Sequence, residues 1–91
     1  MQIEWDEYKN QKNINKHGVS FPYASKVFDD ENRLESDAYR RGGEYRYNVI
    51  GLVDDVLVVA CTDRELDTIR IISARKATKN EEAIYYGDET C

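Results

Sequence analysis

The segment 69–81 reads IRIISARKATKNE and joins an apolar strand to the start of a helix. Isoleucines surround Arg70 in its first half, which predicts a strand over 68–73. Thr78 and Glu81 have the spacing of a capping box, in which each side chain satisfies a backbone N–H at a helix start. A strand that runs directly into a capped helix fixes the end of the fold.

Strand alternation gives this segment two faces, because successive side chains point to opposite sides of a sheet. The face predicted to meet the core holds Ile69, Ile71 and Ser73. Arg70 then points to the opposite face, towards a cleft or solvent. Arg75 and Lys76 follow the strand, beside the helix start. Cations on a rigid element next to a helix N-terminus favour phosphate binding.

Two further arginines are predicted near this cluster. Arg64 leaves the preceding hairpin, and Arg46 lies on a neighbouring strand. Several guanidinium groups can thus converge on one concave face, where their planar forks suit phosphate. The alternative is a set of solvated surface cations paired with Glu65, Asp67 and Glu81, since exposed ion pairs are common and contribute little. Spacing alone favours the surface cations, whereas arginine rather than lysine at Arg64, Arg70 and Arg75, beside a helix N-terminus, favours phosphate binding.

The remaining pattern predicts an α+β domain over 1–91 with the element order β-α-α-β-β-β-β-α. Short turns between successive strands predict an antiparallel sheet with helices packed on it. The helix over 6–17 is polar on nearly every face, with Tyr8 and Ile14 as its apolar anchors. The other expected elements are strands over 2–5, 34–39, 45–52, 56–61 and 68–73 and helices over 20–28 and 78–86.

Composition excludes several classes of protein. The 91 residues carry a formal net charge of −5, which argues against broad nucleic-acid binding and favours a basic protein partner. No apolar run reaches the roughly 20 residues that cross a bilayer, and the acidic start is no signal peptide, so a cytoplasmic protein is expected. Cys61 is predicted to pack as a small hydrophobe, and the tail 88–91 to be frayed. No zinc pattern is present, so we predict neither metal nor cofactor.

Three other side-chain groups have both a chemical and a structural interpretation. His17 is the natural general acid or base, but as a cation in the last turn of a helix it also compensates the dipole. Tyr86 can stack on a nucleobase, whereas Tyr85 is expected to pack on the sheet. The acids at 29–31 are interpreted as a solvated turn rather than a metal site.

Several blocks of the sequence resemble the BrnT toxin family. They are KHGVSF at 16–21, EYR at 44–46 and RIISARKAT at 70–78, and they occur in the family's order over nearly the whole chain. The resemblance implies a RelE-like α+β fold. It also implies the toxin of a type II toxin–antitoxin pair, a ribonuclease that arrests translation and is neutralised by a cognate BrnA-like antitoxin in a heterotetramer. DNA is then contacted only through the antitoxin.

We therefore predict a metal-independent endoribonuclease in which arginines stabilise charge that develops on the attacked phosphate. The predicted catalytic residues are Arg64, Arg70, Arg75 and His17. The predicted RNA-binding residues are Lys16, Arg46, Lys76, Lys79 and Tyr86. The alternative is a binding module without catalysis, whose basic groove holds an acidic segment of an antitoxin or another partner.

Overall fold

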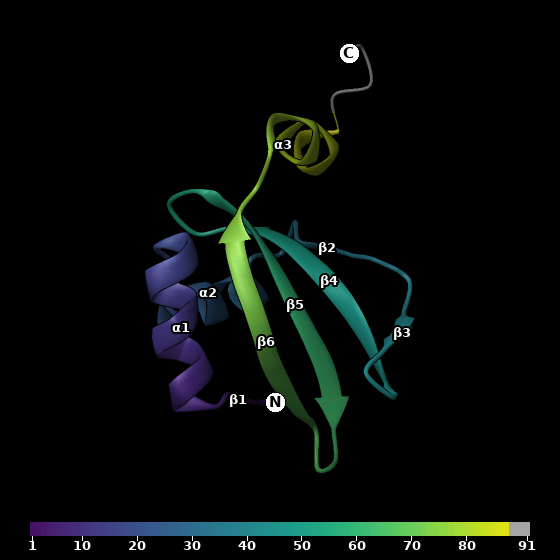
Figure 1. The fold of residues 1–91 in the computed structure, drawn as a ribbon. Helices are drawn as coiled ribbons and strands as arrows, with labels where there is room; N and C mark the ends of the chain where they lie inside the picture. Colours follow the sequence, from purple (N-terminus) through teal and green to yellow (C-terminus); the bar gives the residue numbers. More distant parts are fainter. Residues whose placement is uncertain (88–91) are drawn as a thin grey trace.

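The computed structural model describes residues 1–87 and has an α+β architecture (Figure 1). In chain order the elements are β1 Gln2–Glu4, α1 Glu7–His17, α2 Phe21–Ala24, η1 Ser25–Asp29, β2 Leu34–Glu35, β3 Tyr39–Arg41, β4 Glu44–Leu52, β5 Val56–Arg64, β6 Thr68–Lys76 and α3 Lys79–Tyr86. The helical regions and the three long strands confirm the sequence pattern. The weak strand expected over 34–39 is wrong, because two short strands, β2 and β3, occupy this region instead.

The sheet is mixed rather than purely antiparallel, which corrects the prediction. Its order is β1-β6-β5-β4-β2, and β3 pairs with β4 off this path. The meander β4-β5-β6 is antiparallel as expected, but β1 pairs in parallel with the first residues of β6, from Gln2 opposite Thr68 to Glu4 opposite Arg70. Turn signals could not reveal this pairing, because the two strands are separated by most of the chain.

The core lies between one face of the sheet and the segment formed by α2 and η1. Strands β4 to β6 contribute Val49, Leu57, Val59, Cys61, Ile71 and Ala74, the helical segment contributes Phe21, Ala24, Val27 and Phe28, and Val19 joins them from the loop before α2. Gly51 permits this contact, since a Cβ there would lie 2.8 Å from the Cβ of Val27. Cys61 is fully buried, as predicted, and burial raises its pKa to about 12.

Helix α1 docks through asparagines and not through the predicted Tyr8, which is 71% exposed. Asn10 accepts a hydrogen bond from the backbone N–H of Phe21 at 2.8 Å. Asn13 donates to the carbonyls of Val19 and Ala74, both at 2.8 Å, and accepts from the N–H of Ala74 at 3.2 Å. Because β1 covers only the first part of β6, the Asn13 amide takes the place of a neighbouring strand further along.

A β-bulge in β6 corrects the predicted parity of that strand. Ser73 pairs with Ala60, whereas Ile71 pairs with the next residue, Cys61, so β6 holds one extra residue between them. The bulge turns Ser73 away from the core and places Ala74 inside, where it is 1% exposed. Arg70 does lie on the face opposite the core, as predicted, and it pairs there with Thr62 of β5.

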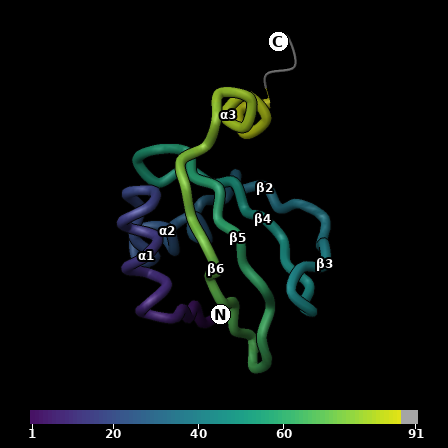
Figure 2. Tube along the Cα trace, in the orientation of Figure 1, coloured from purple at the N-terminus to yellow at the C-terminus, as the bar shows by residue number. Residues whose placement is uncertain are grey.

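Helix α3 stands beyond the end of the sheet (Figure 2) and has no buried residue. Its predicted capping box is present, with Thr78 and Glu81 satisfying each other's backbone N–H groups. The Tyr85 hydroxyl donates to Asp30 at 2.5 Å, so the half-buried Tyr85 joins α3 to the turn that follows η1. Asp30 also accepts from the N–H of Leu52, which makes it an anchor and not only part of a solvated turn.

None of the helices within residues 1–87 is both long and apolar enough to cross a membrane. The tail predicted to be frayed lies outside the described residues.

Candidate functional site

A groove of about 420 Å³ lies on the face of the sheet opposite the core. We call this side the open face. Pairing across β4, β5 and β6 aligns its side chains in rows, one of Ile50, Val58 and Arg75 and one of Asn48, Ala60 and Ser73. On the central strand β5, the side chains that line the groove are the small ones of Val58 and Ala60. The full lining is Tyr39, Arg41, Arg46, Asn48, Val58, Ala60, Ile72, Ser73 and Arg75.

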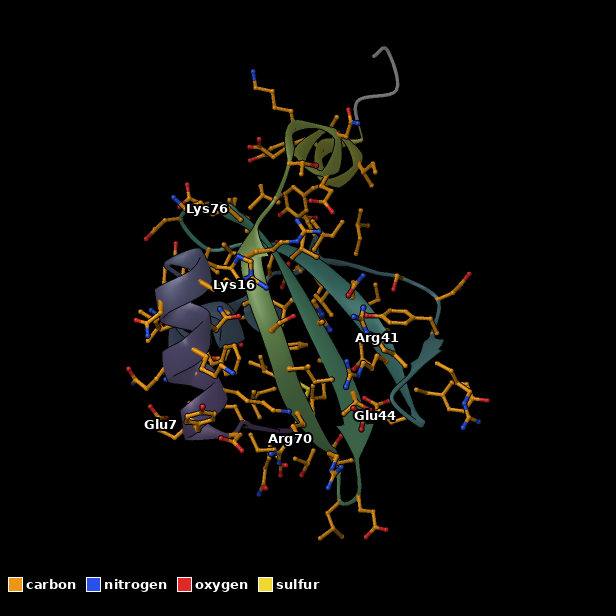
Figure 3. The ribbon with its side chains drawn as sticks, viewed as in Figure 1. Glu7, Lys16, Arg41, Glu44, Arg70 and Lys76 are labelled. Atoms are coloured by element: carbon orange, nitrogen blue, oxygen red, sulfur yellow. The ribbon has the colours of Figure 1, made fainter. Side chains whose placement is uncertain are left out.

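Three arginines line this groove from three different strands. Arg41 ends β3, Arg46 lies on β4 and Arg75 lies on β6. The predicted convergence of Arg46 and Arg75 is thus present. Figure 3 shows Arg41 and Glu44 near the β3–β4 edge of the sheet, across the strands from α1. Guanidinium groups that approach a common space from several sides can surround an anion.

Two of these arginines already hold carboxylates. Arg75 grips Glu81 with both Nη atoms, at 2.6 and 2.9 Å, and Arg46 contacts Glu44 at 2.9 Å. Arg41 has no ion pair among residues 1–87. Glu81 belongs to α3 and is one of the acidic partners named above for surface cations. Arg75 therefore does form the ion pair that this alternative predicts. The same bidentate geometry shows that the Arg75 fork can receive a planar or tetrahedral oxyanion.

The contact with Arg75 keeps the Glu81 carboxylate ionised. The hydrogen bond from Arg75 lowers the pKa of Glu81 to about 2, with smaller support from the N–H and hydroxyl of Thr78. The Arg75 pKa is raised in turn by Glu81. At neutral pH both groups are charged, and a carboxylate with so low a pKa is a weak base.

The shifted pKa of Glu81 predicts a pH-dependent contribution to stability. A carboxylate with a depressed pKa in the folded state stabilises the protein above its unfolded pKa, near 4.5, and this contribution is lost as pH falls towards 2. We expect the Tm difference between the natural protein and Glu81→Gln to be largest above pH 4.5 and to shrink below it. Thermal unfolding followed by circular dichroism at stepped pH measures this. A difference that stays constant over the range contradicts the pairing.

The predicted Arg70 and Arg64 lie on the open face beyond the groove. Thr62 pairs with Arg70 and Arg64 with Thr68, so these residues continue the same side of the β5–β6 ladder. Arg70 contacts Glu4 at 2.7 Å. Arg64 lies in a shallow pocket with acidic neighbours, lined by Glu4, Asp63, Arg64 and Glu65. From the Arg75 rung to the Arg64 rung, β5 advances from residue 58 to residue 64, or about 20 Å.

The other predicted site residues lie outside the groove lining. Lys16 and His17 form the exposed last turn of α1, which Gly18 ends in the left-handed conformation with φ of 71°. Lys76 lines a different pocket and contacts Asp55 at 3.7 Å. Lys79 begins α3, and Tyr86 at its end is 63% exposed, with its ring against that of Tyr85.

Sequence reasoning missed Tyr39, Arg41 and Asn48 in the groove. The signal was present in Gly42-Gly43, because a two-residue glycine turn predicts a hairpin that brings its flanking strands together. Such a hairpin sets Arg41 opposite Glu44 and Tyr39 opposite Arg46. The strand predicted over 34–39 ends at Tyr39, so the sequence pattern leaves Arg41 outside any strand.

Within residues 1–87, no three His, Cys, Asp or Glu side chains cluster in the manner of a metal site. The groove itself offers the guanidinium groups of three arginines, the hydroxyls of Tyr39 and Ser73 and the amide of Asn48.

Comparison with known proteins identifies relatives of this arrangement. A family model described as the ribonuclease toxin BrnT of type II toxin–antitoxin systems matches residues 5–81. A solved structure of the Brucella abortus ribonuclease toxin BrnT is similar with a TM-score of 0.62 and 25% sequence identity. The similarity covers 87% of this chain and 99% of that one. No curated protein is similar enough in sequence to count as a match.

Proposed function

The chain belongs to the BrnT family of ribonuclease toxins of type II toxin–antitoxin systems, and from that premise we propose that it is a metal-independent endoribonuclease. The observation that carries this proposal is the groove in which the three arginines surround the small side chains of Val58 and Ala60. A groove with that lining suits a single phosphate of an RNA strand and the sugar beside it.

In the proposed reaction, a ribose 2′-hydroxyl attacks the adjacent phosphorus and the bond to the 5′-oxygen breaks. The products are a 2′,3′-cyclic phosphate and a 5′-hydroxyl end, with one proton leaving the 2′-oxygen and one reaching the 5′-oxygen. Negative charge grows on the non-bridging oxygens, and arginines held in place before the reaction stabilise it. Much of the rate would then come from positioning and charge rather than from a strong base.

The arginines beyond the groove fit the same substrate. An RNA strand that follows the open face along β6 would pass Arg75, Arg70 and Arg64 in turn. Arg70 and Arg64 are proposed to act on this strand. His17 is proposed to act as an acid or base, and the RNA-binding role is proposed for Lys16, Lys76, Lys79 and Tyr86. For these roles the RNA has to contact the helices and the strand end that flank the open face.

The cellular role follows from the family as a proposal. RNA cleavage would arrest translation in the cytoplasm, and a BrnA-like antitoxin would neutralise the toxin in a heterotetramer that contacts DNA through the antitoxin alone. We also propose that the fold is related to that of RelE toxins. Glu4, Asp63 and Glu65 surround Arg64 and make this surface acidic. Such a surface would attract a basic segment of a partner.

The direct test is incubation of purified protein with single-stranded RNA in EDTA, with and without the antitoxin. We expect defined fragments with cyclic phosphate ends, formed despite the chelator and suppressed by the antitoxin. The absence of cleavage across a range of RNA substrates would reject the nuclease proposal. Loss of cleavage in EDTA that returns with added metal would reject metal independence alone.

A non-catalytic binding module is the second candidate, and one observation favours it. Both Arg46 and Arg75 already hold carboxylates, so the groove is suited to glutamate or aspartate side chains of a partner. Two results together would support the binding module over the enzyme: the antitoxin binds tightly in the groove, and RNA stays uncleaved at high protein concentration.

A further inference from the structure

The proposed reaction needs a proton donor, because the 5′-oxygen is a poor leaving group until a proton reaches it. Most of the groove lining cannot supply this proton. Guanidinium groups keep their protons in proteins, and amide and apolar side chains release none. His17 lies outside the lining, in the last turn of α1. A proton donor inside the groove therefore has to be a hydroxyl group.

Two hydroxyl groups line the groove, on Tyr39 and Ser73. A phenol gives up its proton far more readily than an aliphatic alcohol does, because the ring spreads the negative charge that remains. A phenol nevertheless carries its proton at neutral pH, which is the form that a general acid needs. Of the residues that line the groove, Tyr39 is therefore the one suited to protonate the leaving oxygen.

Strand pairing puts the Tyr39 hydroxyl on the same side of the sheet as the groove arginines. Tyr39 lies opposite Arg46 in the β3–β4 ladder, and its hydroxyl donates to Asn48, two residues further along β4. Arg46 and Asn48 share the open face, and both line the groove. The hydroxyl is thus tied to a groove residue on the face where a bound phosphate would lie.

The hydrogen bond to Asn48 orients the hydroxyl and leaves its proton available. The amide oxygen of Asn48 can only accept, so the hydroxyl carries its proton when the bond is made. The bond is 3.2 Å long, against about 2.7–2.8 Å for a usual bond between a hydroxyl and an oxygen. Tyr39 is also 37% exposed. A substrate oxygen can therefore replace Asn48 as the acceptor.

We propose that Tyr39 is the general acid of RNA cleavage and that Asn48 positions its hydroxyl. The proposal rests on the ribonuclease function proposed above and supplies the proton donor of that reaction. As the bond from phosphorus to the 5′-oxygen breaks, Tyr39 gives its proton to that oxygen. The 2′-hydroxyl loses its proton to water as its oxygen bonds to phosphorus, and the tyrosinate then regains a proton from water. Arginines around the groove stabilise the transient tyrosinate as they stabilise charge on the phosphate.

The test compares two leaving groups in a short RNA whose cleavage site has been mapped. One RNA is natural, and the other carries sulfur in place of the 5′-oxygen at the cleaved bond. A thiolate leaves without a proton, so the sulfur RNA needs no general acid. At saturating protein and single turnover, we expect Tyr39→Phe to cleave the natural RNA about 100- to 10,000-fold more slowly than the natural protein does. The same variant should cleave the sulfur RNA nearly as fast as the natural protein does.

Two further variants separate the roles. Asn48→Ala should slow cleavage of the natural RNA less than Tyr39→Phe does, and the sulfur RNA should relieve this loss too, because Asn48 acts through Tyr39. Tyr45→Phe is the matched control, since Tyr45 lies on the same hairpin opposite Arg40 and is not among the residues that line the groove. It should leave both rates unchanged.

Several results would overturn the role of Tyr39. One is cleavage of the natural RNA by Tyr39→Phe at the natural rate. Another is an equal loss on both RNAs, which would mean that the hydroxyl serves binding or folding and not proton transfer. If the natural protein cleaves both RNAs and only the Tyr39→Phe pattern fails, the nuclease proposal stands without this acid. If the natural protein cleaves neither RNA, the nuclease and its acid are rejected together.

Discussion

Arg75→Ala is expected to lower the rate of RNA cleavage about 100- to 1,000-fold, whereas Glu81→Gln is expected to preserve or increase activity. The two side chains form one bidentate pair, at 2.6 and 2.9 Å. Either substitution breaks that pair and removes the same link between β6 and α3. Only Arg75→Ala removes the guanidinium that is proposed to receive the phosphate, so the paired variants separate chemistry from folding.

The carboxylate of Glu81 occupies the Arg75 fork when RNA is absent. A phosphate that binds there has to displace it, and Glu81→Gln removes this competition. RNA affinity should then rise by up to about fivefold, the range expected for losing a partly exposed ion pair. Glutamine can still accept the backbone hydrogen bond of the capping box, so α3 should remain helical.

The measurement is single-turnover cleavage of a labelled RNA by both variants and by Arg75→Lys, with circular dichroism to confirm the fold. Lysine keeps the charge but lacks the planar fork, so an intermediate rate is expected. Cleavage by Arg75→Ala at the natural rate would exclude Arg75 from the reaction. Equal losses in Arg75→Ala and Glu81→Gln would show that the pair acts only by holding α3.

Local signals in the sequence were sufficient for most of the elements. Asp6, Ser20 and Thr78 each accept backbone hydrogen bonds at a helix start, and the apolar residues spaced along the segment after Ser20 form its buried face. These features depend on residues three or four positions apart. The parallel partner of β1 and the bulge at Ile72 depend on residues distant in the chain, and no local pattern encodes them.

The candidate site was predictable in part for the same reason. Strand parity places Arg70 on the open face, and the resemblance to BrnT toxins singles out the block that contains Arg75. The bulge then brings Ser73 to that face as well, against the regular alternation. Glu4 reaches Arg70 through β1 pairing, which the sequence alone does not specify, whereas Glu44 and Arg46 lie two residues apart on β4 and share a face by strand alternation.

Polar residues on α1 mark the largest difference between sequence pattern and structure. Apolar spacing predicted that Tyr8 would anchor the helix, yet Asn10 and Asn13 are 4% and 7% exposed and Tyr8 faces solvent. An amide side chain carries both donors and an acceptor, so it can satisfy backbone groups that an apolar side chain would leave unpaired. Helix docking here depends on hydrogen bonds to the backbone at positions a hydropathy pattern assigns to the surface.

Asn13→Ala is therefore expected to lower the free energy of unfolding by about 3 kcal/mol, because it leaves buried backbone groups without partners. The lost bonds are those to the Val19 carbonyl and to both the carbonyl and N–H of Ala74. Asn15→Ala is the matched control, since Asn15 is exposed on the same helix and its loss should change stability by less than about 0.5 kcal/mol.

Urea unfolding of both variants measures this difference, and Asn13→Asp refines it. Aspartate keeps an acceptor for the Ala74 N–H but sets a carboxylate against two carbonyl oxygens, so its loss of stability should exceed that of alanine at neutral pH and lessen as the carboxylate is protonated. If Asn13→Ala cost no more than Asn15→Ala, the amide would not be what holds α1 against β6. Because β6 carries Ser73 and Arg75 on the opposite face, loosening this edge should also reduce RNA cleavage in proportion to the unfolded or detached fraction.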